Sequence, residues 1–246
     1  MLHTEVISVK NLTKTYKNGR GIQDISFSVN KGDVVGLLGP NGSGKTTTMK
    51  AIIGLCHPEQ GEILVFGKSL EGNFEKIMAN VGALIEAPAI YSELTAYKNL
   101  ELAANFYPHV NKVRINKVLE LVHLDQYKND KAGRFSLGMK QRLGLALTFL
   151  SEPQLIILDE PANGLDIEGM IEIREIISAM SQKYGTTFLI SSHLAPELEK
   201  VCNKVCVIHS GEMIDFTDMS SALELNPTLE DYFLRKVREK RGTIEI

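Results

Sequence analysis

The chain has 246 residues, a net charge of −3 and 43% hydrophobic residues, which is ordinary for a folded domain. The weakly acidic balance gives no overall attraction to nucleic acid or to anionic lipid, so it argues against both as general partners. No apolar run approaches the roughly 18 to 20 residues that cross a bilayer, and the N-terminus lacks a signal-peptide pattern. Taken alone, the sequence predicts a soluble cytoplasmic protein.

The first 85 residues are rich in predicted strands. Apolar and polar residues alternate over residues 6–9 and again over 25–29, which is typical of half-buried strands. Asn18 and the glycine after it form a turn signal between them. Short apolar runs at 34–38 and 61–67 predict two further strands.

Residues 39–47 read GPNGSGKTT and fit the P-loop pattern G-x-x-x-x-G-K-[ST]. They lie between the strand at 34–38 and a predicted helix at 46–54, the order that the motif requires. Glycines let backbone N–H groups surround phosphate oxygens, and the helix N-terminus adds a favourable dipole. The lysine is expected to reach the β- and γ-phosphates, and the first threonine to ligate Mg²⁺. The predicted nucleotide contacts are Gly39, Pro40, Asn41, Gly42, Ser43, Gly44, Lys45, Thr46 and Thr47.

Residues 87–153 change character, because apolar residues recur there at helical spacing in three stretches. These stretches are 96–106, 110–122 and 136–150. After them, strands and helices alternate. The apolar run 155–158 suits a central parallel strand. A helix around 170–180 and strands at 186–191 and 204–208 follow. This order predicts an α/β core whose parallel sheet is covered by helices, interrupted by a helical insert.

An acidic pair follows the strand at 155–158. Asp159 is placed to hold Mg²⁺, directly or through water, and Glu160 is the candidate general base for the water that attacks the γ-phosphate. The other acidic and basic signals have simpler interpretations. A basic cluster at 235–241 predicts either a solvated helix end or a contact with an anionic membrane surface.

Residues 135–142 read FSLGMKQR and make the whole chain resemble the ATP-binding subunit of an ABC transporter. The family signature is Leu-Ser-Gly-Gly-Gln followed by Gln-Arg. This sequence matches it at Ser136, Gly138, Gln141 and Arg142, and departs from it at positions 135, 137 and 139. A serine hydroxyl and glycine amides at a helix N-terminus form an anion site, so Ser136 and Gly138 are predicted to bind phosphate.

The resemblance implies an α/β fold: a P-loop NTPase (RecA-like) core with an N-terminal antiparallel β subdomain and an inserted α-helical subdomain. The whole of 1–246 would form a single ATP-binding domain. Its core would comprise 1–86 and 154–225, its helical insert 87–153, and its C-terminal helical tail 226–246.

The resemblance also assigns roles to site residues. Tyr16 would stack on adenine. The anion site at Ser136 would close over the γ-phosphate held by a second copy, and Asp166 would lie at that dimer interface. His193 resembles the switch histidine that contacts the γ-phosphate and helps to align water with Glu160.

Glu86 departs from the family, which usually has glutamine at the start of the insert. A carboxylate is still a good ligand for a hard cation, so Glu86 is a predicted metal ligand together with Thr46 and Asp159. The alternative is a surface glutamate before a proline turn. This glutamate and the ending at 229–234 are similar to ATPases of bacterial exporters that protect against bacitracin and lantibiotics.

The function expected from the resemblance is the ATP-hydrolysing motor of an ABC exporter, using ATP and Mg²⁺. A second ATP-binding subunit, expected to be another copy of the chain, and a separate integral membrane permease would be its partners. The insert would bind the permease, and the permease would hold the chain at the inner face of the cell membrane. Peptide immunity is the leading hypothesis, and export of another drug, lipid or ion is the alternative. A soluble ABC ATPase acting on nucleic acid or ribosomes is disfavoured by the single P-loop and the absence of sustained heptads. Glu160 and His193 argue against a P-loop kinase.

Overall fold

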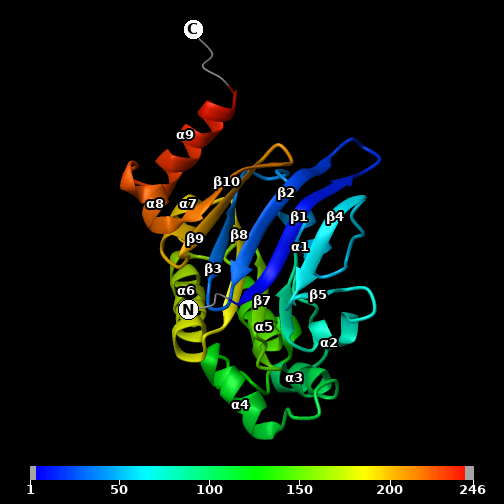
Figure 1. Cartoon of the computed structure of the whole chain (residues 1–246). Helices are drawn as coiled ribbons and strands as arrows, with labels where there is room; N and C mark the ends of the chain where they lie inside the picture. The colour runs from blue at the N-terminus through cyan, green and yellow to red at the C-terminus, as the bar shows by residue number, and fades with distance from the viewer. Residues whose placement is uncertain (1–3, 242–246) are drawn as a thin grey trace.

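The computed structural model describes residues 4–241, so the first three residues and the last five of the predicted tail lie outside it (Figure 1). The strands, in chain order, are β1 (Glu5–Thr15), β2 (Gly21–Asn30), β3 (Val34–Leu38), β4 (Gln60–Val65), β5 (Lys68–Ser69), β6 (Val81–Leu84), β7 (Leu155–Asp159), β8 (Thr187–Ser192), β9 (Lys204–His209) and β10 (Glu212–Asp218). The helices are α1 (Lys45–Ile52), α2 (Phe74–Met78), α3 (Ala96–Ala104), α4 (Lys112–Leu121), α5 (Leu137–Phe149), α6 (Ile167–Tyr184), α7 (Ala195–Glu199), α8 (Met219–Glu224) and α9 (Leu229–Arg241), with a 3₁₀ turn η1 at Ala132–Arg134.

The strands form one mixed sheet in the order β5-β4-β1-β2-β10-β9-β3-β8-β7-β6. Its central part is parallel, because β3 pairs in parallel with both β9 and β8, and β7 and β6 continue the same direction. Strands β2, β1 and β4 are antiparallel. β10 joins the two parts, antiparallel to β9 and parallel to β2. The predicted α/β fold, with an antiparallel N-terminal part, is confirmed.

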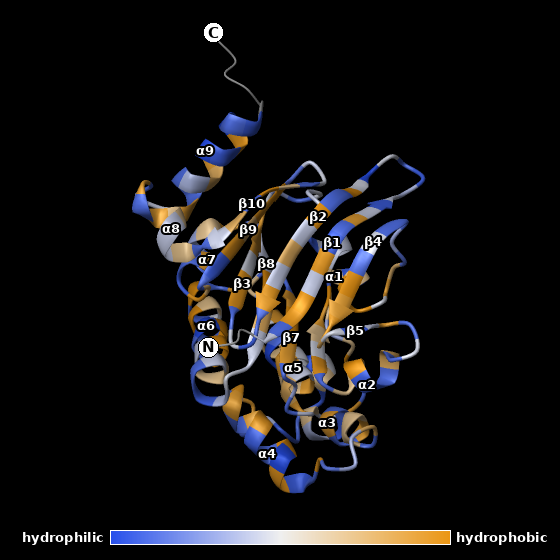
Figure 2. Cartoon of the chain, in the orientation of Figure 1, coloured by the Kyte–Doolittle hydropathy of each residue, from blue (hydrophilic) through white to orange (hydrophobic). Residues whose placement is uncertain are grey.

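Side chains of the central strands alternate between two hydrophobic layers, because successive residues of a strand point to opposite faces. In β7, Ile156 and Leu158 pack in the layer that contains α5 and α6, whereas Leu155 and Ile157 pack with β1 and β2. Met49 of α1 lies in this second layer, so α1 is packed between the central and the antiparallel strands. Figure 2 shows apolar and polar residues alternating along β1 and β2.

The segment between β6 and β7 is helical, as its periodicity predicts. Leu100 of α3, Leu119 of α4 and Leu145 of α5 are fully buried in one layer. Helix α5 also packs on β6, where a Cβ on Gly82 would lie 2.4 Å from the carbonyl oxygen of Thr148. Glycine is therefore required for this close approach.

Three strands, β5, β6 and β10, are missing from the sequence predictions, and β5 has only two residues. β6 is short and contains Gly82, a residue that is depleted in strands. In β10, a register shift between Met213 and Asp215 interrupts the alternation that would reveal a strand. Helix α9 lies in the predicted C-terminal tail and projects from the rest of the molecule in Figure 1. Within residues 4–241, no helix is long and apolar enough to span a bilayer.

Candidate functional site

The loop between β3 and α1 has the conformation expected of a phosphate cradle. Gly42 and Gly44 have φ angles of 78° and 113°, a region that glycine adopts without steric cost. Gly39 is fixed by crowding instead, since a Cβ there would lie 2.0 Å from the carbonyl oxygen of Ile208. Glycine at these positions is therefore required by geometry, and the bare backbone leaves room for a bound phosphate.

Two polar side chains are buried in this loop. Lys45 is 5% exposed, and its Nζ donates to the carbonyl oxygen of Gly39 at 2.8 Å and lies 3.3 Å from Glu160 Oε1. Ser43 Oγ is buried and has no hydrogen-bond partner among the described residues. Leaving a buried hydroxyl unpaired costs free energy. The orphaned hydroxyl and the buried ammonium therefore fit an anionic ligand that contacts both.

Asp159, at the end of β7, is held by two hydroxyl groups. Thr46 Oγ1 donates to Asp159 Oδ2 at 2.8 Å, and Ser191 Oγ donates to Asp159 Oδ1 at 2.5 Å. The second contact follows from the parallel register, which places Ser191 of β8 opposite Asp159. Sequence reasoning assigned no role to Ser191. The available signal was its position at the end of a strand expected beside residues 155–158.

Glu160 lies between the P-loop lysine and His193. Its φ of 49° is uncommon for a residue other than glycine, and its backbone N–H donates to Ser191 Oγ at 2.9 Å. Its Oε2 lies 2.8 Å from Nδ1 of His193, and its Oε1 faces Lys45. The structure thus brings two other predicted residues, Lys45 and His193, to the Glu160 carboxylate.

The residues present fit Mg²⁺ better than a transition metal. Among residues 4–241, no group of three or more histidine, cysteine, aspartate or glutamate side chains is placed to hold a metal. Mg²⁺ does not need such a group, because it is usually bound by one or two carboxylates together with water and substrate phosphates. The adjacent hydroxyl of Thr46 and carboxylate of Asp159 match that pattern.

Glu86 lies against α1 rather than against these two groups. Its Oε1 is 2.6 Å from Nζ of Lys50, and no hydrogen bond or ion pair within the described part of the chain joins it to Thr46 or Asp159. The hydrogen bond to Glu86 raises the pKa of Lys50, with smaller contributions from Tyr16 and Asp159, although partial burial lowers it. Lys50 was not predicted as a site residue. The sequence feature that could have identified Lys50 is its spacing of four residues from Thr46, which places both on one face of a helix.

Tyr16 follows the end of β1 and is 39% exposed. Burial raises the pKa of the Cys56 thiol, and a hydrogen bond to the Tyr16 hydroxyl partly offsets this. The ammonium of Lys14 lies 5.9 Å from the centre of the tyrosine ring. The Tyr16 side chain is therefore anchored beside the segment that follows α1 and remains partly exposed.

The structure places Ser136, Gly138 and Asp166 in a different location. Ser136 caps α5 by accepting a hydrogen bond from the backbone N–H of Met139 at 3.2 Å, and Asp166 caps α6 by accepting one from Gly169 at 2.9 Å. Together with Gly138 they line an open pocket of about 440 Å³. No hydrogen bond or ion pair of residues 4–241 links the three to the P-loop, so they form a second candidate site.

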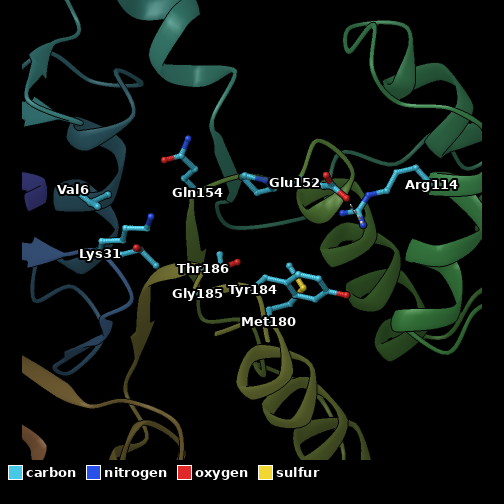
Figure 3. A pocket seen from close by; sticks show the side chains of 11 residues that line it. Val6, Lys31, Arg114, Glu152, Gln154, Met180, Tyr184, Gly185 and Thr186 are labelled. Atoms are coloured by element: carbon cyan, nitrogen blue, oxygen red, sulfur yellow. Dashed lines mark ion pairs between the residues drawn. The ribbon is translucent and has the colours of Figure 1, made fainter. Parts of the chain in front are cut away.

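Another pocket, of about 420 Å³, lies where the insert meets the core (Figure 3). It is at the start of β7 and β8, whereas Asp159 is at the end of β7. Arg114 of α4 lines it. Its guanidinium donates to the carbonyl oxygens of Phe149 and Leu150 at the end of α5, and pairs with Glu152 at 3.2 Å. Burial lowers the pKa of this arginine. None of the predicted site residues lines this pocket. The contacts of Arg114 join two helices of the insert, because they hold α4 to the end of α5.

The fold and the first site together define a P-loop nucleotide-binding protein: a parallel sheet, a glycine loop that opens a helix, and an acidic pair at the end of a neighbouring strand. Residues 22–163 match the ABC transporter family, and the chain belongs to that family. It is an ABC ATPase, as the sequence resemblance predicted.

Relatives of known name show which transport ATP-binding proteins the chain is similar to. The chain is 41% identical over 226 residues to a bacitracin transport ATP-binding protein of Enterococcus faecalis, which covers 92% of the chain and 73% of the relative. It is 34% identical over 237 residues to a lantibiotic transport ATP-binding protein of Streptococcus pyogenes, covering 96% of the chain and 100% of the relative. These are the two peptide classes to which the sequence showed a resemblance.

Solved structures agree with the fold. An ATP-binding subunit of an ABC transporter superimposes with a TM-score of 0.84 at 29% identity, covering 95% of this chain and 100% of the other. An ATP-binding cassette solved as a dimer with ADP and Pi superimposes with a TM-score of 0.77 at 24% identity, covering 87% and 98%. The second likeness supports the fold alone.

Proposed function

We propose that the chain is the ATP-hydrolysing motor subunit of an exporter that gives immunity to antimicrobial peptides of the bacitracin or lantibiotic type. The observation that carries the motor role is the Glu160 carboxylate, held between Lys45 and His193 beside the P-loop. The names of the two relatives support the peptide class. Export of another drug, lipid or ion is the alternative.

The P-loop site would hold ATP and Mg²⁺. Residues 39–47 would surround the phosphates, Tyr16 would stack on adenine, and Thr46 and Asp159 would ligate the metal, with Glu86 as a third predicted ligand. When bound, Mg²⁺ neutralises charge on the β- and γ-phosphates. The ammonium of Lys45 would exchange its contact with Glu160 for phosphate oxygens.

That exchange would free Glu160 to act as general base. A water beside the γ-phosphate would give its proton to the Glu160 carboxylate as its oxygen bonds to phosphorus, and the bond to the leaving ADP oxygen would break. His193, which contacts Glu160 at 2.8 Å, would orient this carboxylate and bind the γ-phosphate. Ser191 would fix the backbone between Asp159 and Glu160.

The second site would act on another copy of the chain. Ser136 and Gly138 would contact the γ-phosphate on the P-loop of that copy, and Asp166 would lie at the interface. We expect a homodimer that forms on ATP and separates after hydrolysis. In this arrangement 1–246 is one ATP-binding domain, with a core of 1–86 and 154–225 and a tail of 226–246.

The insert, 87–153, would bind the cytoplasmic part of a separate membrane permease and so keep the protein at the inner face of the membrane. The test is to express the chain with the membrane protein encoded beside its gene in a peptide-sensitive bacterium. Growth in bacitracin and in a lantibiotic should be restored by the native pair and lost with Lys45→Ala. If cells with the native pair and cells with the Lys45→Ala variant were equally sensitive to the peptides, peptide immunity would be contradicted.

A further inference from the structure

Two carboxylates follow neighbouring parallel strands and leave the sheet at the same edge. β6 pairs with β7 in parallel, with Leu84 opposite Leu158. Asp159 is the next residue of β7, and Glu86 lies two residues beyond Leu84. The carboxyl ends of adjacent parallel strands are where α/β proteins place ligands. Both acidic groups are therefore close to the proposed phosphate site.

Helix α1 presents one group to each carboxylate from successive turns. Thr46 and Lys50 are four residues apart, so they share a face of the helix and differ in height by about 6 Å. Thr46 Oγ1 lies 2.8 Å from Asp159 Oδ2, and Lys50 Nζ lies 2.6 Å from Glu86 Oε1. The φ of Glu86 is 63°, a strained value for glutamate. The chain thus adopts an unfavourable turn at the residue whose carboxylate meets Lys50.

Folding stability does not account for this ion pair. The Lys50 and Glu86 side chains are 28% and 65% exposed, and ion pairs this exposed contribute little to folding. If Glu86 were unpaired, its carboxylate would instead repel a bound triphosphate, which carries several negative charges.

We infer that Lys50 is a positioning residue of the nucleotide site. It holds the Glu86 carboxylate against α1 and cancels its charge, so that the site accepts a triphosphate although glutamate stands at this place. The inference rests on the proposed binding of ATP at residues 39–47.

The test is ATP binding to the full chain, measured by isothermal titration calorimetry at low ionic strength with EDTA. Without Mg²⁺, any contact between Glu86 and the metal is kept out of the measurement. Lys50→Gln should raise the Kd by about five- to tenfold, because it leaves Glu86 unpaired. Lys50→Arg should stay near the native Kd. The double variant Lys50→Gln, Glu86→Gln should return to within about twofold of it.

Lys240→Gln is a matched control. Lys240 of α9 forms an ion pair of similar length with Glu212 of β10, at 2.7 Å. It should leave the Kd unchanged. The effect of Lys50→Gln should also shrink at high ionic strength, as electrostatic repulsion does.

A native Kd for Lys50→Gln would overturn the inference. So would a double variant as weak as Lys50→Gln alone, because the loss would then come from altered structure rather than from the charge of Glu86. If the native chain itself failed to bind ATP, the proposed nucleotide site would be wrong, and that outcome is distinct from both of the others.

Discussion

The P-loop site and the pocket at Ser136 are both built at the start of a helix, yet their polar groups differ in burial and in the partners they have within the chain. Lys45 and Asp159 are 5% and 4% exposed and bonded to groups of the same chain. Ser136 and Asp166 are exposed, and their side chains accept hydrogen bonds that cap their own helices. The comparison teaches that nucleotide affinity should reside in a single chain, whereas the exposed polar groups at Ser136 are free to meet the second copy that we propose.

The largest expected effect is on hydrolysis at the complete site. Glu160→Gln removes the base but keeps the shape and hydrogen bonds of the side chain, so the rate of phosphate release should fall about 10²-fold or more. ATP should then hold the dimer together, which light scattering with and without ATP would reveal. Glu175→Gln, on an exposed position of α6, is the control. Near-native turnover would remove Glu160 as the base.

The next effect separates the two sites. Ser136→Ala should leave the Kd of the monomer for ATP unchanged but abolish ATP-dependent dimerisation, because its proposed phosphate contact is made to a second copy. The loss of a helix cap costs about 1 kcal/mol of stability. Thr95→Ala is matched to it, since Thr95 caps α3 through the N–H of Lys98 at 3.1 Å. Both variants should be destabilised alike, and only Ser136→Ala should fail to dimerise.

A smaller effect tests how α4 is held to the end of α5, the helix that Ser136 caps. Arg114→Met removes hydrogen bonds to the end of α5, so the free energy of unfolding should fall by about 1 to 3 kcal/mol. The Kd for ATP should not change, because this pocket lies at the opposite end of β7. Denaturant titration measures the first quantity, with the exposed Lys117→Met as control. An unchanged unfolding free energy would show that Arg114 does not anchor α5.

The smallest effect concerns the contact between α9 and β10. Burial alone would raise the pKa of Asp215, but hydrogen bonds from Lys236 and Tyr232 lower it overall. A lowered pKa in the folded state stabilises the fold above the ordinary value of 3.8 and is lost as the pH falls through the folded pKa. Asp215→Asn should therefore cost less than about 1 kcal/mol at pH 7. The difference from the native chain should shrink below about pH 3.8. A constant difference down to pH 2 would contradict this role.

Sequence patterns predicted the nucleotide loop because its residues are contiguous and their chemistry depends on local backbone shape. The strand at 155–158 and the helices of the insert were also readable, since their apolar periodicity is regular. β6 and β10 could not be predicted from the sequence. Gly82 shortens the apolar run of β6, and a register shift interrupts the alternation in β10. Ser191 gained its importance only from strand pairing with Asp159.

Glu86 shows most clearly what the sequence alone does not predict, namely which side chain a charged residue meets. The sequence placed a carboxylate at the start of the insert and predicted a metal ligand, which stays a prediction. The tertiary structure supplied Lys50, whose ammonium reaches that carboxylate across the gap between α1 and β6.

The sequence by itself determined the class of protein and the loop that binds phosphate, because glycine, lysine and threonine at fixed spacing act through neighbouring backbone atoms. Only the tertiary structure decided which charges meet. Ion pairs and hydrogen bonds act over about 3 Å, whereas Lys45 and Glu160, or Lys50 and Glu86, are far apart in the chain. They are brought together by the parallel register of β6, β7 and β8 and by the packing of α1 between the two parts of the sheet.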